Sequence, residues 1–181
     1  TNYLIAGFGQ LNKLPHANPD DEAVIGPMVR KAQQYADQQL IAQYEQLLAL
    51  AAEQKINLED NHLSPAIVHY LYARSYWTDQ PVGAALQDAL DYFLQQAENY
   101  WLNGHLLQQA QIGQISQRTG NNRLARLISA SLQERALHTP ELGMYWKYRS
   151  GYFWYQSPIE THTTLMQFFA EMGEASIVNE L

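Results

Sequence analysis

The stretch PAIVHYLYA, residues 65–73, is apolar on almost every side and contains no Lys, Arg, Asp or Glu. A helix that is apolar all round is buried on all sides, whereas a helix with one apolar stripe lies on a surface. The stretch therefore predicts an inner helix, from Ser64 to Trp77, that other helices enclose. Residues 2–14, 102–119 and 158–172 share its shortage of charge, and we expect three more inner helices there.

Amphipathic segments alternate with these inner segments along the chain. They cover about residues 24–54, 82–101 and 122–137, and each sets an apolar stripe against charged residues. On the first of them, we assign the following residues to the apolar side: Ile25, Met28, Ala32, Tyr35, Leu40, Tyr44, Leu47 and Ala51. This alternation predicts a layer of outer helices that covers a layer of inner ones.

The predicted fold class is all-α, because no alternation of strands with helices is visible. Within that class, helical hairpins in two layers are typical of a partial α/α toroid. An open solenoid of two-helix repeats is the alternative. Inner segments begin near residues 2, 64, 105 and 158, and this uneven spacing argues against a regular repeat. We expect a partial ring, because the number of segments is small for a complete one.

Length and composition limit the classes of function. A chain of 181 residues is normally one domain, and its charge of −7 with only 11 basic residues lacks the positive surface needed to bind nucleic acid. Without cysteine, there is no disulfide, thiolate zinc site or cysteine nucleophile. No apolar run is long enough for direct membrane insertion, and no signal peptide is visible. Both ends lie inside helical patterns, so we interpret residues 1–181 as a single domain-type fragment of a larger protein.

The sequence SPIE, residues 157–160, is typical of a helix start. It places Ser157 at the N-cap, Pro158 at the first helical position and Glu160 at the third. The Ser157 hydroxyl can accept from the Glu160 amide, while the Glu160 carboxylate reaches back to the Ser157 amide. This capping box accounts for Glu160 without catalysis.

The other polar candidates also have structural interpretations. Lys13, Arg74 and Arg118 each fall near the C-terminal end of an inner helix, where a cation complements the helix dipole. His62 and His69 are seven residues apart, but no third ligand follows at metal spacing, so we interpret them as polar contacts. We assign no catalytic residue, metal or cofactor, because no nucleophile has an identifiable base.

Aromatic residues crowd the connection that precedes the last inner segment. The candidate surface for a ligand or a neighbouring domain consists of Tyr145, Trp146, Tyr152, Trp154 and Tyr155. Such rings stack on sugars, peptides or cations, so one interpretation is a ligand platform. The other, which we favour, is a two-stranded flap formed around GYFWYQ, whose rings plug the end of the barrel.

The segment GMYWKYRSGYFWYQSPIETHTTLMQFFAEM, residues 143–172, resembles the corresponding stretch of bacterial alpha-2-macroglobulin-like proteins, the large secreted α-helical type found in Bacteroidetes. In that family an aromatic run precedes a Pro-Ile-Glu-Thr helix start. NYLIAGFGQLNKL (2–14), HYLYARSYW (69–77) and QQAENYWL (95–102) fit the same family in the same order. The resemblance covers most of the chain.

The resemblance implies a part of the thioester-type domain, an α/α toroid related to terpenoid cyclases and complement domains. It also implies an extracytoplasmic protein (periplasmic, anchored to the outer membrane or secreted) that traps or inhibits proteases. Its partners would be target proteases and the neighbouring domains. The Cys-x-Glu-Gln thioester motif is absent from these residues, so it lies upstream of Thr1 or this member has none. No catalytic residue carries over, and we expect a non-enzymatic module.

A carbohydrate-binding or carbohydrate-cleaving domain on the same toroid is the alternative function. Sugar hydrolysis would need two carboxylates about 5–10 Å apart. Glu160 with Asp88 or Asp91 is the pair that we propose for it, although the sequence does not bring these residues together.

Overall fold

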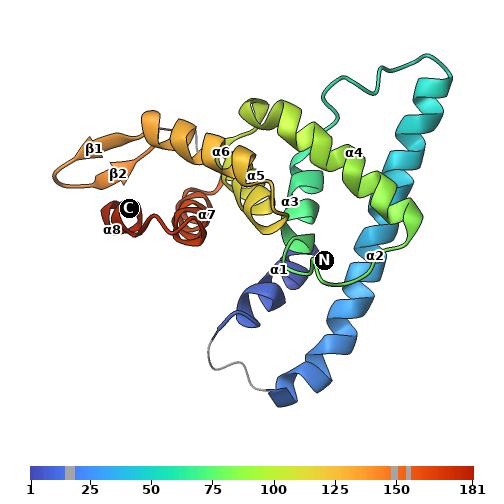
Figure 1. The fold of residues 1–181 in the computed structure, drawn as a ribbon, viewed down its shortest axis with the longest axis horizontal. Coiled ribbons are helices and arrows are strands. Elements are labelled where there is room, and N and C mark those ends of the chain that lie inside the picture. Colours follow the sequence, from blue (N-terminus) through green and yellow to red (C-terminus); the bar gives the residue numbers. More distant parts are fainter. Residues whose placement is uncertain (15–18, 148–150, 154–155) are drawn as a thin grey trace. The chain divides into compact units, whose positions relative to one another are not determined.

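The computed structural model of the chain describes residues 1–14, 19–147, 151–153 and 156–181. The described residues form helices and one small two-stranded sheet, which confirms the all-α class (Figure 1). The chain divides into two compact units, Thr1–Asn99 and Tyr100–Leu181. Each unit is described by itself below.

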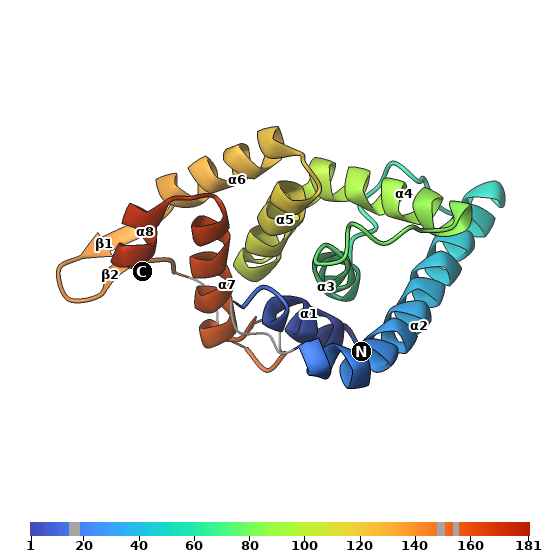
Figure 2. The same ribbon diagram turned by 60° about the horizontal axis from the view of Figure 1, so that its bottom comes forward.

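The described residues of unit 1 form four helices. They are α1 (Asn2–Leu11), α2 (Pro19–Ala52), α3 (Pro65–Arg74) and α4 (Ala84–Tyr100). Figure 2 views α3 nearly along its axis, with α1, α2 and α4 around it. Every residue of α3 from Ile67 to Arg74 is buried, so the inner helix predicted from PAIVHYLYA is confirmed.

The start of α3 follows from its local sequence. The Ser64 hydroxyl accepts a hydrogen bond from the Ile67 amide at 3.2 Å, and Pro65 occupies the first turn. A serine cap satisfies one of the amide groups that have no partner within the helix, and proline there removes another. The same Ser-Pro chemistry begins the last long helix of unit 2.

The first helix differs from the prediction that it is buried on all sides. Ile5, Ala6 and Gly9 are buried, because they lie on the side of α1 that packs against the other helices of unit 1. Tyr3, Leu4 and Leu11 are exposed. At the Gly9 position, the Tyr76 ring comes so close that an added Cβ would lie 2.5 Å from it. The shortage of charge therefore predicted an apolar helix correctly. It did not predict how much of the surface of that helix is buried against the described residues.

The apolar side assigned to α2 is also partly wrong. Met28 and Tyr35 are exposed, as is Val24, while Val29 and Ala36 are buried. Helical geometry places Val29, Gln33, Ala36 and Leu40 on one face, opposite Val24, Met28 and Tyr35. The residues assigned to a single stripe in fact belong to two faces, because a long helix with scattered apolar residues offers more than one stripe.

Unit 2 contains the remaining elements. They are the 3₁₀ turn η1 (Trp101–Asn103), α5 (Leu106–Arg118), α6 (Asn122–Glu134), β1 (Leu137–Thr139), β2 (Gly143–Tyr145), α7 (Pro158–Glu171) and α8 (Ala175–Glu180). Helix α5 packs against α6 and α7, and its residues from Leu107 to Ser116 are all buried. At Gly113 the Phe168 ring of α7 would lie 2.6 Å from an added Cβ, so this glycine permits a close helix contact.

The hairpin β1–β2 is antiparallel, with Leu137 opposite Tyr145 and Thr139 opposite Gly143. Helix α8 packs against β2. Gly143 has a φ of +68°, and the Glu180 carbonyl oxygen occupies the space where a side chain would begin. Glycine is therefore required here both for the backbone conformation and for the contact with α8.

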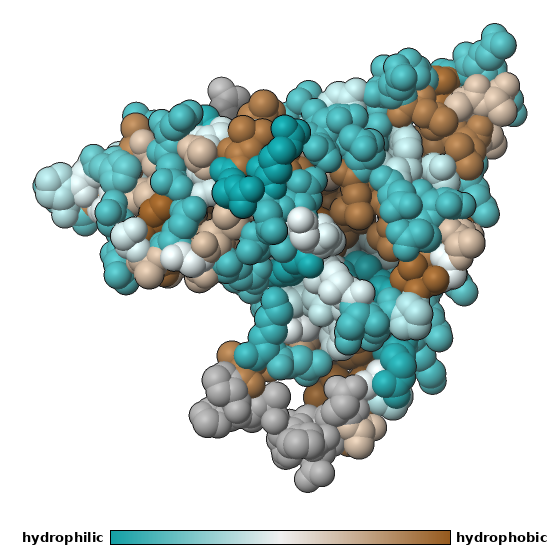
Figure 3. Space-filling view, in the orientation of Figure 1, coloured by the Kyte–Doolittle hydropathy of each residue, from teal (hydrophilic) through white to brown (hydrophobic). Residues whose placement is uncertain are grey.

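The surface of the described residues is mostly hydrophilic in the view of Figure 3, and one of its groups of apolar residues lies around the C-terminal end of α2. Among the described residues, none of the helices combines the length and the apolar character that a membrane span requires.

Candidate functional site

The structure separates the predicted aromatic surface into a buried part and an exposed part. Trp146 belongs to the core of unit 2, where it is 6% exposed. Its indole Nε1–H donates to the Leu132 carbonyl at 2.8 Å, and its ring stacks on Phe169 with an interplanar angle of 11°. Assigning Trp146 to a contact surface was therefore wrong, because both the ring and its only polar atom are used inside the unit.

Tyr145 lies in β2 and is half-buried. The two strands that the structure describes are β1 and β2, upstream of GYFWYQ. The flap predicted around GYFWYQ includes residues that lie outside the described ones, and it stays a prediction. The hairpin β1–β2 forms because Gly143 supplies the positive φ and α8 covers the strand. Trp154 and Tyr155 of the predicted surface lie outside the described residues.

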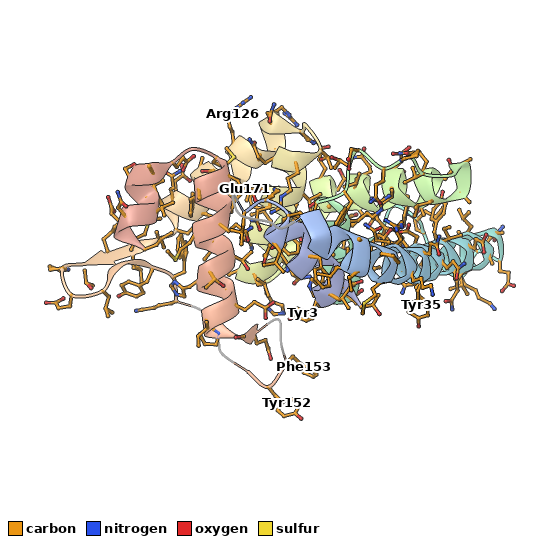
Figure 4. The ribbon with its side chains drawn as sticks, turned by 90° about the horizontal axis from the view of Figure 1, so that it is seen from below. Tyr3, Tyr35, Arg126, Tyr152, Phe153 and Glu171 are labelled. Carbon is orange, nitrogen blue, oxygen red and sulfur yellow. The ribbon has the colours of Figure 1, made fainter. Side chains whose placement is uncertain are left out.

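Tyr152 and Phe153 form the exposed part, which we call the aromatic tip (Figure 4). Tyr152 is 98% exposed and Phe153 is 56% exposed, and their rings meet edge to face with centroids 6.0 Å apart. Figure 4 shows both side chains projecting beyond the helices of unit 2. An exposed aromatic pair of this kind is suited to contact another molecule or domain.

Two hydrogen bonds join Phe153 of the aromatic tip to Gln156. The Gln156 side-chain oxygen accepts from the Phe153 amide at 3.3 Å, and the Gln156 amide donates to the Phe153 carbonyl at 2.9 Å. Gly151 leaves room for the Gln156 amide group, which an added Cβ would displace. Gly151 and Gln156, the first and last residues of GYFWYQ, thus support the tip, a role that the sequence analysis did not assign to them.

The helix start after the tip has the predicted chemistry at Ser157. Its hydroxyl accepts from the Glu160 amide at 3.5 Å, and Pro158 occupies the first turn of α7. Glu160 lies in that first turn, where its charge complements the helix dipole. Glu160 belongs to unit 2, whereas Asp88 and Asp91 belong to unit 1, and the carboxylate pair proposed for sugar hydrolysis stays a prediction.

Two of the predicted dipole caps have carboxylate partners. Arg118 donates to both carboxylate oxygens of Glu171, at 2.9 and 2.6 Å, and so joins α5 to α7. Arg74 donates to the Trp77 carbonyl at 2.6 Å, and its Nε lies 3.6 Å from an Asp37 oxygen, an ion pair longer than a hydrogen bond. Sequence reasoning missed both partners, because they lie far away along the chain.

A buried polar cluster links α2 to α3. The Tyr70 hydroxyl donates to Asp37 at 2.5 Å, and the same carboxylate oxygen faces Arg74. Burial raises the pKa of Tyr70 well above its usual range, and the hydrogen bond to Asp37 acts in the same direction. Tyr70 therefore stays protonated and serves as a donor, so the cluster has the features of a structural link and lacks a free base.

The histidines do not form a metal pair. His69 is buried between the rings of Tyr3 and Tyr72, with centroids 4.3 and 6.2 Å away, and burial is the main cause that lowers its pKa to about 4. His62 Nε2 lies 2.8 Å from the Asn57 carbonyl oxygen. Among the described residues, no group of three or more His, Asp or Glu side chains is placed to hold a metal ion.

Comparison with known proteins adds no identity: no family model matches the sequence, and no curated protein or solved structure matches it.

Proposed function

We propose that this chain is an interaction module of a larger extracytoplasmic protein of the alpha-2-macroglobulin-like kind, in which it takes part in trapping or inhibiting proteases. The observation that carries the proposal is the aromatic tip. Tyr152 is almost fully exposed beside a half-exposed Phe153, and the Phe153 backbone is hydrogen-bonded to Gln156. Tyrosine and phenylalanine are enriched in protein interfaces, because they bury a large area with few rotatable bonds.

The chemistry of the described side chains supports a module more than an enzyme. Glu171 is bound by Arg118, and Asp37 is bound by Tyr70 and Arg74. Glu174 accepts from Ser129 and Gln133, each at 2.8 Å. These carboxylates join helices and have partners, whereas catalytic acids and bases need a site that substrate can reach.

The resemblance of residues 143–172 to alpha-2-macroglobulin-like proteins supplies the parent protein and the protease partners in this proposal. We also propose the finer fold on that basis, a partial α/α toroid related to terpenoid cyclases and complement thioester domains. A sugar-binding toroid domain is the competing proposal, because exposed aromatic rings also stack on sugars.

The native polypeptide provides the test. An antibody raised against residues 1–181 is used on fractionated cells of the source, before and after a broad-specificity protease is added. We expect a band far larger than 20.7 kDa in the envelope or secreted fraction, cleaved early into a few large pieces. A band at 20.7 kDa would refute the proposal and turn attention to sugar binding by the aromatic tip.

A further inference from the structure

Two buried N–H groups of unit 1 have no hydrogen-bond acceptor among the described residues. One is Nε2 of Gln33 in α2, and the other is Nε of Arg74 in α3. Gln33 is 4% exposed and Arg74 is 8% exposed, so bulk water does not reach these two groups. An unpaired buried donor is destabilising, and most buried donors in folded proteins bind a protein acceptor or an ordered water molecule.

Both groups belong to the polar cluster around Asp37. Arg74 Nε lies 3.6 Å from Asp37 Oδ1, which is too far for a hydrogen bond. Gln33 precedes Asp37 by one turn of α2, and residues four apart are neighbours on the surface of a helix. Helices α2 and α3 run in opposite directions (Figure 1), and Arg74 follows Tyr70 by one turn of α3. Gln33 and Arg74 therefore lie toward the same end of the cluster.

We infer that this cluster binds an ordered water molecule, whose oxygen accepts hydrogen bonds from Gln33 Nε2 and Arg74 Nε. The water donates one of its hydrogens to the Asp37 carboxylate. A carboxylate has about four acceptor positions, and the Tyr70 hydroxyl takes one of them. Buried water molecules in proteins typically make about three hydrogen bonds to polar groups that lack other partners. The bound water thus bridges Asp37 and Arg74, whose direct contact is too long for a hydrogen bond.

The charges of the cluster favour water over an ion. Asp37 and Arg74 carry opposite charges, which compensate each other. A bound anion would accept from the same two N–H groups, but it would add an uncompensated negative charge beside Asp37. A cation would lie next to the Arg74 guanidinium and two N–H groups, which repel it. A neutral molecule that both accepts and donates hydrogen bonds fits the cluster, and water is the smallest one.

Proton NMR of the 181-residue chain tests the site directly. A water molecule that stays bound while the protein tumbles gives a cross-relaxation peak with the N–H protons that donate to it. We expect such peaks at Arg74 Nε–H and at the Gln33 side-chain amide. Arg118 is the matched control, because its side chain is 7% exposed against 9% for Arg74. Its Nε donates to Glu171 at 2.9 Å, so we expect no water peak there.

Three variants separate bound water from other sources of the signal. The Tyr70 hydroxyl proton exchanges with bulk water beside Asp37, and it could relay a water signal to Arg74. We expect the Arg74 peak to persist in Tyr70→Phe, where this relay is removed. We expect Gln33→Leu to weaken the peak severalfold, because the water loses one of its partners. Gln34→Leu is the control for that change, since Gln34 is an exposed neighbour in α2, and it should leave the peak unchanged.

A crystal structure of the unsubstituted chain is the second measurement, and it decides the question if Gln33→Leu does not fold. We expect water density about 2.7–3.2 Å from both Gln33 Nε2 and Arg74 Nε. A direct hydrogen bond from Arg74 Nε to the Gln33 side-chain oxygen or to Asp37, without a water peak in the NMR spectrum, would overturn the inference. The inference also fails if the peak disappears in Tyr70→Phe, or if it keeps its full intensity in a folded Gln33→Leu.

Discussion

The Tyr70 hydroxyl of α3 donates a hydrogen bond to Oδ1 of Asp37 in α2, and the same oxygen lies 3.6 Å from Arg74 Nε. Tyr70 and Arg74 are one turn apart on the buried inner helix, so both reach α2 from the same face. The cluster joins the longest helix of unit 1 to its most buried one.

Removal of the Asp37 carboxylate should weaken unit 1 strongly. Asp37→Ala leaves the buried Arg74 charge without its ion pair, and such losses cost about 3–5 kcal/mol. Tyr70→Phe removes one hydrogen bond and should cost about 1–3 kcal/mol. Urea unfolding of the two single variants and the double variant measures the coupling. If the two losses simply add, the residues do not act as a cluster.

Stability should fall as pH is lowered from 6.5 toward 4 because of His69. Burial lowers its pKa to about 4 in the folded protein, below the ordinary value of 6.5, so the unfolded state binds the proton more strongly in that interval. Neutral His69 makes its full contribution to the free energy of unfolding above pH 6.5. This contribution, up to about 3 kcal/mol, is lost as the pH falls toward 4.

His69→Gln replaces the titrating imidazole with a side chain that does not titrate. His138→Gln is the control, because His138 is exposed. The free energy of unfolding is measured between pH 7 and pH 5, and the slope should be smaller in His69→Gln than in the parent protein. Equal slopes in the two proteins would show that His69 does not titrate in this way.

Trp146 and Tyr152 should differ sharply in their effect on stability. Trp146→Ala removes a core ring and its hydrogen bond to Leu132, at a cost of about 3–5 kcal/mol. Tyr152→Ala alters an exposed side chain and should change stability by less than about 0.5 kcal/mol. Chemical denaturation of both variants checks this, and a large loss in Tyr152→Ala would show that the aromatic tip is covered inside the protein.

The aromatic tip should affect interaction and not folding. In the native polypeptide, Tyr152→Ala with Phe153→Ala should reduce retention of a cleaving protease severalfold, while Leu142→Ala, at another exposed apolar residue of unit 2, leaves it unchanged. Retention is measured by gel filtration of the protein mixed with protease. Saturable binding of an oligosaccharide that is lost in Tyr152→Ala would favour the sugar-binding alternative instead.

The start of α7 should behave as a structural cap. Ser157→Ala removes the acceptor for the Glu160 amide and should cost about 1 kcal/mol. Glu160→Gln should cost at most about 1 kcal/mol and leave protease retention intact. Thermal unfolding measures the first effect and gel filtration the second. A variant Glu160→Gln of unchanged stability that has lost a sugar-cleaving activity would reveal a catalytic carboxylate.

Local sequence determined where the helices lie and how several of them begin. PAIVHYLYA forms a buried helix, as its lack of charged residues predicted. Ser64 and Ser157 cap helices because their hydroxyls reach amide groups three residues ahead. Interactions of this kind depend on residues within one or two turns, so they can be predicted from spacing alone.

Tertiary structure decided which side chains of those elements are covered. Trp146 and Tyr152 are both aromatic and lie in the same connection, yet one donates to the Leu132 carbonyl in the core and the other is almost fully exposed. Burial depends on partners that are distant in the sequence, as in the 53-residue separation of Arg118 and Glu171. Composition and periodicity report only on near neighbours, and for that reason the sequence predicted the helices but not their contacts.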